Sequence, residues 1–152
     1  MSEPTATGTT TPAAETDPDC LFCRIVAGEV PSRRIYADEH AVAFLDIGPW
    51  HRGHSLVVPR RHVADVVSGP PALLEIAPAI DAVARLLMRT LAADGVNLLS
   101  SAGPVAGQEV FHLHVHVVPR YADEPGLALL VNPDTVPDGE LDSVFAQVTA
   151  GP

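Results

Sequence analysis

The sequence predicts an α+β fold: a mostly antiparallel sheet of about five strands, one long helix and a short N-terminal helix. Three short apolar segments separated by acidic residues, glycine and proline are typical of an antiparallel meander. A stretch with apolar residues at helical spacing follows, and then two more strand-like segments. Because 152 residues is the size of one ordinary domain, we expect a single core.

The first half of the chain contains a short helix and three strands. CLFCRIVAGEV, starting at Cys20, has apolar residues at helical spacing, and Gly28 is expected to end the helix. The segments RRIYAD, AVAFLD and HSLVVP, at 33–38, 41–46 and 54–59, predict the three strands.

The long helix is expected between residues 70 and 93, where apolar residues recur with the i, i+3, i+4, i+7 pattern. Because proline suits the first position of a helix, the main helix is expected to begin at Pro78, and Gly95 to end it. VNLLSS and VFHLHVHVVP, at 96–101 and 110–119, predict two further strands. GELDSVFAQV carries a weak final helical pattern.

The two ends differ in composition from the middle. Residues 1–18 are rich in Thr, Ala and Pro and predict a disordered tail, 19–122 form the domain, and 123–152 form a C-terminal extension that is partly ordered. The N-terminus lacks the features of a secretory signal, and no apolar run is long enough to span a membrane. A soluble cytoplasmic protein is therefore expected.

Charge excludes several functions. The net charge is −10 and all nine basic residues are arginines, so no broad cationic surface for DNA or RNA is expected. The lack of lysine also excludes a P-loop lysine, a Schiff base and a lysine nucleophile.

Three histidines alternate with aliphatic residues in His112-Leu113-His114-Val115-His116. Side chains in a strand alternate between its faces, so the three imidazoles share one face. A water-exposed polar face is one interpretation. Acid–base, nucleophilic or metal chemistry is favoured, because imidazole suits all three near neutral pH.

The segment HLHVHVV resembles the complete signature of the histidine-triad superfamily. Its flanks, AGQEV before and Pro119-Arg120 after, and the upstream blocks FLDI and GHSLVVP are also similar to that family. The resemblance covers roughly residues 20–120 and implies the family's fold. Because His116 is not replaced by glutamine, the chain resembles the hydrolase branches more than the hexose-phosphate uridylyltransferases.

The resemblance implies a mechanism. His114 would attack the α-phosphorus and form a covalent nucleotidyl-histidine, which water then hydrolyses. His116 would assist at a phosphate oxygen or the leaving group, and His54 matches the family's fourth histidine. His40 and His51 are expected at the surface, although His51 could edge the pocket.

The same resemblance implies a nucleotide site. Gly107 and Gln108 would bind phosphate oxygens and Glu109 would relay a proton to the leaving group. Asp46 would accept hydrogen bonds from ribose, with a turn-forming role as the alternative. Ser101 stands where many relatives have asparagine, so that contact is either replaced or lost. The positions around the base, which could also be ordinary core, are Leu21, Phe22, Ile25, Phe44 and Ile47.

Cys20 and Cys23 form a Cys-x-x-Cys pair, which is half of a tetrahedral zinc site. Two buried thiols or a redox pair are the alternatives. Some bacterial histidine-triad proteins complete the site with histidines that correspond to His62 and His112. Such a closed Cys2His2 set implies structural zinc, and no catalytic metal is expected.

The expected function is hydrolysis of a nucleoside phosphoramidate or a related adenine nucleotide, with dinucleoside polyphosphates as the alternative substrates. The expected partners are a purine nucleotide and, by the family resemblance, a second copy in a homodimer. Two other interpretations stay open: a catalytic zinc held by the histidines, and a nucleotide-binding sensor without catalysis.

Overall fold

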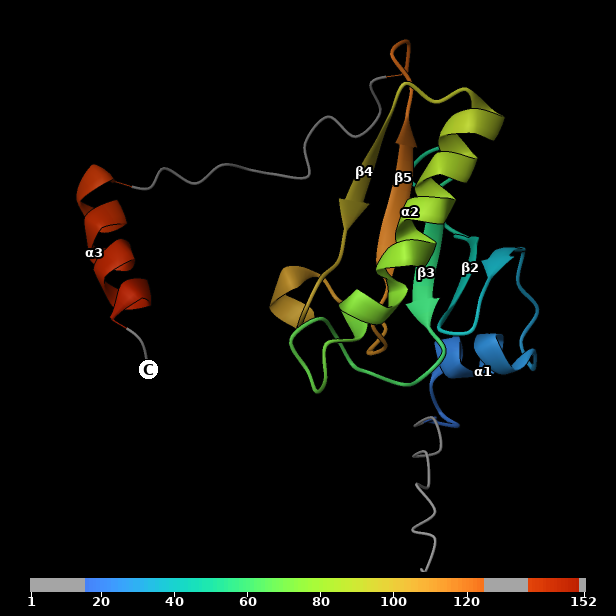
Figure 1. The fold of residues 1–152 in the computed structure, drawn as a ribbon, viewed down its shortest axis with the longest axis horizontal. Coiled ribbons are helices and arrows are strands. Elements are labelled where there is room, and N and C mark those ends of the chain that lie inside the picture. The colour runs from blue at the N-terminus through green and yellow to red at the C-terminus, as the bar shows by residue number, and fades with distance from the viewer. Residues whose placement is uncertain (1–15, 125–136, 151–152) are drawn as a thin grey trace, which may run out of the picture.

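The structure is a computed structural model that describes residues 16–124 and 137–150. The described part is an α+β fold with a five-stranded antiparallel sheet, one long helix and a short N-terminal helix, as the sequence predicts (Figure 1). The elements are α1 (Leu21–Ala27), β1 (Arg34–Ala37), β2 (Ala41–Leu45), β3 (Ser55–Pro59), α2 (Ala72–Leu91), β4 (Gly95–Leu99), η1 (Pro104–Ala106), β5 (Val115–Arg120) and α3 (Asp138–Thr149).

The strand order in the sheet is β1-β2-β3-β5-β4, and every neighbouring pair is antiparallel. The first three strands form the expected meander. β5 enters between β3 and β4, where His116 pairs with Leu56 on one side and Leu99 on the other. The last histidine of the motif therefore lies inside the sheet, not at its edge.

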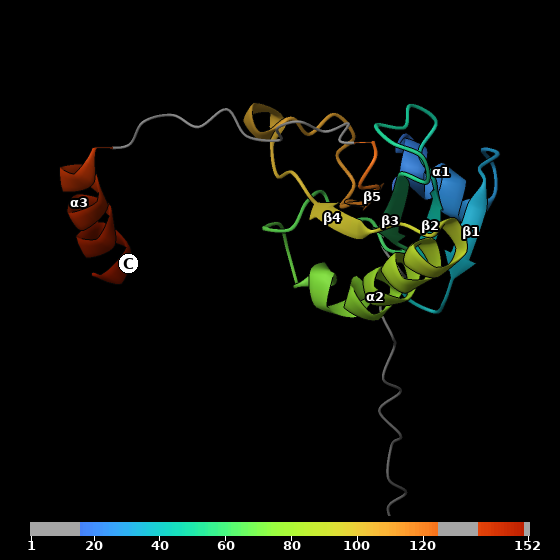
Figure 2. The ribbon, with the colours of Figure 1, turned by 90° about the horizontal axis from the view of Figure 1, so that it is seen from above.

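The helices α1 and α2 cover opposite faces of the sheet (Figure 2). α2 packs its buried face, including Ile76 and Val83, against Leu113 and the inward side chains of β2, β3 and β5. α1 packs Phe22 and its neighbours against a second cluster on the other face. The sheet thus has a purely structural side under α2 and a side under α1 on which a site can be built.

The expected start of α2 at Pro78 is wrong, because the helix begins at Ala72 and Pro78 lies inside it. A proline there removes one helical hydrogen bond. Ala72, Ile76 and Ala79 are all buried on the same face, so apolar burial extends the helix through the proline.

Gly95 does not end α2. Ala92 does so in a left-handed conformation, with φ 51°. Gly95 is instead the first residue of β4, opposite Arg120 of β5.

The expected strand over 110–119 is partly wrong, since β5 begins only at Val115. The preceding segment is held by single long-range hydrogen bonds, such as Leu113 N–H to the carbonyl oxygen of Val63 at 2.6 Å. His112 and His114 therefore owe their positions to tertiary contacts, and only His116 to the sheet.

Two expectations about the termini fall largely outside the described residues. These are the disordered tail, for which 1–15 are not described, and the segment 125–136 of the C-terminal extension. The final helical pattern corresponds to α3, on which Leu141, Val144, Phe145 and Val148 are exposed. In the described part of the chain, no helix is long and apolar enough to cross a membrane.

Gly53 precedes His54 at a tight approach to α2. Its φ is +83°, and an added Cβ would overlap Cδ1 of Leu91 and lie 3.1 Å from Cγ of Pro119. We expect Gly53→Ala to lower the free energy of unfolding by about 1–2 kcal/mol because of the left-handed backbone. Overpacking against Leu91 and Pro119 should lower it by about 1–3 kcal/mol more. Urea unfolding measures the difference.

Gly69→Ala is the matched control, because Gly69 has φ +67° but open space around its Cβ position. We expect Gly69→Ala to lower the free energy of unfolding only by the backbone contribution of about 1–2 kcal/mol. Equal losses in the two variants would contradict the close approach of Gly53 to Leu91.

Candidate functional site

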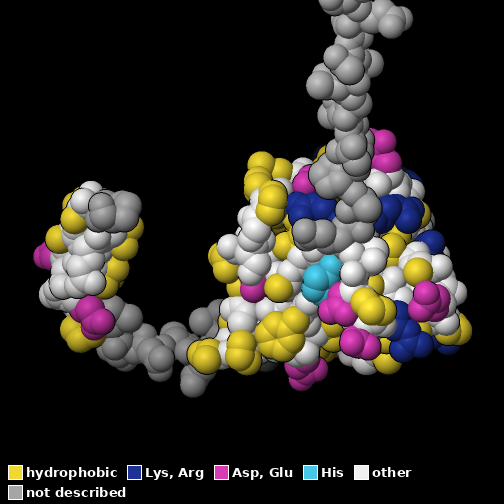
Figure 3. Space-filling view, turned by 90° about the horizontal axis from the view of Figure 1, so that it is seen from below, with side chains coloured by type: hydrophobic (Ala, Val, Ile, Leu, Met, Phe, Trp, Pro, Cys, Tyr) yellow, Lys and Arg dark blue, Asp and Glu magenta, His cyan; other side chains and the backbone are white. Residues whose placement is uncertain are grey.

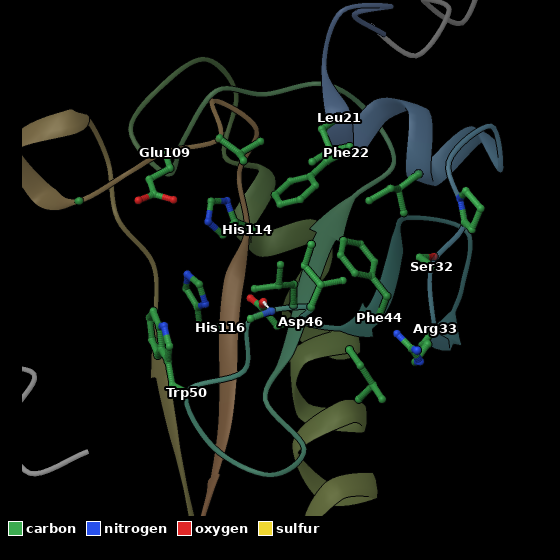
Figure 4. A pocket seen from close by; sticks show the side chains of 18 residues that line it. Leu21, Phe22, Ser32, Arg33, Phe44, Asp46, Trp50, Glu109, His114 and His116 are labelled. Carbon is green, nitrogen blue, oxygen red and sulfur yellow. Dashed lines mark hydrogen bonds between the residues drawn. The ribbon is translucent and has the colours of Figure 1, made fainter. Parts of the chain in front are cut away.

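A cavity of about 750 Å³ opens on the α1 side of the sheet, a volume suited to a nucleotide-sized ligand. It is bounded by α1, the chain entering β1, the end of β2 and the loop before β5 (Figure 4). The lining residues are Leu21, Phe22, Ile25, Pro31, Ser32, Arg33, Phe44, Leu45, Asp46, Ile47, Gly48, Trp50, Leu56, Gly107, Glu109, Val110, His114 and His116.

His114 lines the pocket with a defined tautomer. Its Nδ1 lies 2.7 Å from the carbonyl oxygen of His112, and since a carbonyl only accepts, Nδ1 carries the hydrogen. Nε2 therefore keeps its lone pair. The hydroxyl of Ser100 donates to the carbonyl oxygen of His114 at 2.8 Å and holds the segment in place. The arrangement suits a neutral imidazole nucleophile.

His54 and His116 form a hydrogen bond in which His54 is the donor. The backbone N–H of Trp50 donates to Nδ1 of His54 at 3.0 Å, so Nε2 of His54 carries the hydrogen. That Nε2 donates to Nδ1 of His116 over 2.8 Å. The neutral His116 ring consequently has its own hydrogen on Nε2, where it can donate to a ligand.

Burial keeps this pair uncharged. Burial, assisted by His114 and His54 and opposed by Asp46, lowers the pKa of His116 to about 4. Burial also lowers the pKa of His54, again against the effect of Asp46. The indole of Trp50 stacks on His116 at 4.4 Å between ring centroids and an interplanar angle of 18°. Both rings are therefore neutral near pH 7.

Asp46 fits both roles considered for it. Its Oδ1 accepts the N–H of Gly48 at 2.7 Å, which is the turn-forming role. Its Oδ2 lies 3.8 Å from Nε2 of His54, and the side chain lines the pocket (Figure 4). One carboxylate oxygen thus fixes the turn while the other is placed for a ligand.

Gly107 and Glu109 line the pocket, but Gln108 does not. Gln108 is buried, and its Nε2 donates to the carbonyl oxygens of Ala64 at 2.6 Å and Val110 at 3.1 Å. Its Oε1 accepts the N–H of Gly103 at 2.8 Å. The side chain that was expected at the phosphate instead fastens the loop that carries Gly107.

Ser101 also lies outside the pocket lining. The five apolar residues expected around a base all line it, as Leu21, Phe22, Ile25, Phe44 and Ile47. Phe22 and Phe44 meet edge to face at 5.7 Å between centroids, and both are buried. Ile47, by contrast, is 91% exposed and forms an open rim.

Sequence reasoning missed Ser32, Arg33 and the full role of Trp50. The only sequence signal for Trp50 was its position beside His51, which could edge the pocket. His51 was expected at the surface, but its side chain is only 7% exposed. Its Nε2 donates to the carbonyl oxygen of Glu124 at 3.0 Å. His40 is exposed, as expected.

Cys20, Cys23, His62 and His112 come together, with one potential ligand atom from each within 4.8 Å of the others. The Cys20 and Cys23 sulfurs lie 3.4 and 3.5 Å from Nδ1 of His112, and Cys23 lies 3.4 Å from Nδ1 of His62. His112 donates from Nε2 to the carbonyl oxygen of Pro59 at 3.0 Å, which leaves Nδ1 as a lone pair for a metal.

The thiols also fit a cation. Burial raises the pKa of the Cys23 thiol, so a stable thiolate there needs a positive charge beside it. The N–H of Asp17 is directed at the Cys23 sulfur at 3.4 Å. Donor type, tautomer and outer hydrogen bonds all suit a closed Cys2His2 metal site.

Asp46, His54 and His116 form a second group within 4.8 Å. Here the tautomer does not fit a metal. The Trp50 N–H fixes the hydrogen of His54 on Nε2, the atom that would have to coordinate. Of the two groups in the described part of the chain, only the cysteine-containing one has hydrogen bonds matched to a metal, which disfavours a catalytic zinc.

On the face shown in Figure 3, arginine side chains are interspersed with acidic and apolar ones, and histidine surface reaches solvent beside acidic groups.

Histidines at alternate positions, beside a nucleotide-sized pocket on a five-stranded antiparallel sheet, define the histidine-triad class of protein. The chain belongs to the HIT family, because the model of the HIT domain matches residues 27–123.

Relatives agree with this assignment. "Protein hit" of Bacillus subtilis is 40% identical over 109 residues, 71% of this chain and 75% of that protein. "Adenylylsulfatase HINT3" of Arabidopsis thaliana is 34% identical over 103 residues, 67% of this chain and 52% of that protein. A Zn-bound histidine triad family protein from Mycobacterium smegmatis has a TM-score of 0.67 and 37% identity, covering 87% of this chain and 96% of that one.

Trp50 provides a test of the neutral histidine pair. Trp50→Ala lets water reach His116, so its pKa should rise from about 4 toward 6.5, because solvation favours the charged ring. NMR titration of the His116 ring measures the shift. Trp50→Phe retains an aromatic cover and should change the pKa little. Titration of His116 near 6.5 in the unaltered protein would contradict the arrangement.

Proposed function

We propose that the protein hydrolyses a purine nucleoside phosphoramidate, or a related adenine nucleotide, through a nucleotidyl intermediate on His114. The observation that carries the proposal is the hydrogen bond from Nδ1 of His114 to the carbonyl oxygen of His112, 2.7 Å long. It leaves Nε2 as a nucleophilic lone pair, with the ring lining the pocket.

In the first step, Nε2 of His114 bonds to the α-phosphorus and the bond from phosphorus to the leaving amine breaks. The amine takes a proton through Glu109, which lines the same end of the pocket. The nucleotidylated ring is cationic, and the His112 carbonyl oxygen stabilises it through the Nδ1 hydrogen. Water then attacks phosphorus and gives its proton to Glu109, which replaces the proton passed to the amine, and the phosphorus–Nε2 bond breaks.

The pocket orients the nucleotide for this attack. The Nε2–H of His116 donates to a non-bridging phosphate oxygen, and the Gly107 amide donates to another. Oδ2 of Asp46 accepts from the ribose hydroxyls. The base enters the slot that Phe22, Ile25 and Phe44 line. Because His116 is a neutral donor, it binds the phosphate without giving up a proton at rest.

The family supports nucleotide hydrolysis, and the name of the Arabidopsis relative supports an adenylate with a small leaving group. Dinucleoside polyphosphates stay as the alternative substrates. A family member that only senses nucleotides would bind substrate without turning it over.

His114→Asn tests the nucleophile. We expect kcat on adenosine and guanosine 5′-phosphoramidates to fall by about 10³-fold or more, because the displacement can no longer be divided into two steps. Rapid quench and mass spectrometry should find nucleotide on the His114 peptide of the unaltered protein and none in the variant.

The control is His40→Asn, at an exposed histidine. Full turnover by His114→Asn would exclude the nucleophile. Tight binding without turnover by the unaltered protein would instead favour a sensor.

We further propose that Cys20, Cys23, His62 and His112 hold zinc, which as a closed site supplies structural cross-linking and no water activation. The group joins α1 to the segment before β5. One ligand, His112, is also the residue whose carbonyl oxygen positions His114. The metal would therefore fix the pocket without entering the reaction.

Metal analysis should find one zinc per chain, lost in Cys23→Ser. That variant should lose about 4 kcal/mol or more of unfolding free energy, the size typical of losing a bound metal. His116→Gln, in the other group, should keep its zinc. Loss of zinc from His116→Gln but not from Cys23→Ser would assign the metal to the catalytic pair.

A homodimer and a cytoplasmic location complete the proposal. β4 is an edge strand of the sheet, and Leu98 on it is 54% exposed. An edge strand that has one neighbour among the described residues and carries an exposed leucine suits pairing with a second copy.

A further inference from the structure

The pocket has an end that the proposed reaction does not use. His114, His116, Glu109 and Trp50 lie at one end, while Ser32 and Arg33 lie at the other, beyond Phe44 (Figure 4). With phosphate at the histidines and ribose at Asp46, the outer edge of the base would point toward Arg33. The following inference rests on the proposed function.

The guanidinium of Arg33 has no partner in the part of the chain that the structure describes. Among the residues that the structure describes, Arg33 and Arg89 are the arginines whose side chains form no hydrogen bond, ion pair or aromatic contact. Its neighbour Arg34, in contrast, donates to the carbonyl oxygen of Ile25 at 2.9 Å. In a chain of net charge −10, a guanidinium left unpaired at a pocket wall is available for a ligand.

The backbone fixes Arg33 relative to the rest of the site. The carbonyl oxygen of Arg33 accepts the N–H of Leu45 at 3.0 Å, and Leu45 precedes Asp46. The ribose-facing carboxylate and the guanidinium thus start from hydrogen-bonded positions on adjacent segments. Between them lies the apolar slot of Phe22, Ile25 and Phe44.

We infer that Arg33 recognises the O6 and N7 edge of a 6-oxopurine, so that guanine or hypoxanthine nucleotides are the preferred substrates. A guanidinium donates two parallel hydrogen bonds to these two acceptors. Adenine has N7 but carries an amino donor in place of O6, which faces the guanidinium with like polarity. A pyrimidine in the same slot is too short to fill it.

The apolar slot and Asp46 favour this ligand over an additional phosphate. A second phosphate on the ribose would lie beside the Asp46 carboxylate and be repelled by it. A flat base edge between aromatic walls leads directly to the guanidinium instead.

The experiment compares the turnover of guanosine, inosine and adenosine 5′-phosphoramidates by the unaltered protein and by Arg33→Met. This variant keeps an unbranched apolar side chain, shorter than that of arginine, and removes the charge and the hydrogen-bond donors. We expect kcat/KM for guanosine and inosine to exceed that for adenosine by about tenfold, the low end for an exposed bidentate contact. In Arg33→Met this ratio should fall to about one.

Arg24→Met is the matched control. Arg24 lies on α1, outside the pocket lining, and its guanidinium is 3.6 Å from the carboxylate of Glu29. Arg24→Met therefore also removes one arginine charge, at the same end of the molecule as Arg33. The ratio of guanosine to adenosine should stay about tenfold in this variant.

Three results would overturn the inference: equal kcat/KM for the three substrates in the unaltered protein, an unchanged ratio in Arg33→Met, or a loss of preference in Arg24→Met. Equilibrium binding of GMP, IMP and AMP, followed by the fluorescence of the single tryptophan, repeats the comparison without chemistry. No turnover with a tenfold preference for GMP and IMP would refute the proposed function and keep the role of Arg33.

Discussion

The site depends on His112, which links two centres through two of its groups. Its ring contributes Nδ1 to the Cys2His2 group, and its carbonyl oxygen accepts the Nδ1 hydrogen of His114 at 2.7 Å. The ring is fully buried and is held by the Pro59 carbonyl oxygen at 3.0 Å. Any displacement of the metal group would therefore move the acceptor that sets the tautomer of His114. The three histidines of the motif share a segment but have different contacts: His112 lies against the cysteines, and His114 and His116 line the pocket.

Neutral imidazoles are the second constraint. Burial disfavours the charged ring and the neighbouring His114 and His54 add to this effect, so the pKa of His116 falls to about 4. Fixed donors and acceptors then determine which nitrogen carries each hydrogen: Trp50 N–H acts on His54, His54 on His116, and the His112 carbonyl on His114. One lone pair and one N–H result, and these are the two groups that attack on phosphorus requires. No lysine is needed for this chemistry, and the chain has none.

The sequence predicted most of the fold because periodicity reports local structure. Alternation and helical spacing located the strands and the long helix, and the Cys-x-x-Cys pair with the family motif located the metal group. Periodicity failed where tertiary contacts decide. His112 and His114 precede β5 and are positioned by hydrogen bonds such as Leu113 to Val63, and Pro78 is tolerated because burial on both sides continues α2. Gln108 matches the family motif, but its amide forms hydrogen bonds with Ala64 and Val110, which the sequence alone does not indicate. Arg33 has no local pattern at all, since an unpaired cation is recognisable only when its surroundings are known.

A metal bound by Cys20, Cys23, His62 and His112 would also affect the base slot, through α1. This helix has seven residues, too few for a stable helix on its own. Cys20 at its N-terminus and Cys23 within it belong to the Cys2His2 group, while Leu21, Phe22 and Ile25 line the pocket. A metal that cross-links Cys20 and Cys23 to His62 and His112 would therefore order the same turn of backbone that forms one wall of the slot. A structural metal in this position would hold both the nucleophile and the wall against which the base packs, so substrate affinity and chemistry would weaken together on its loss, although neither uses the metal directly.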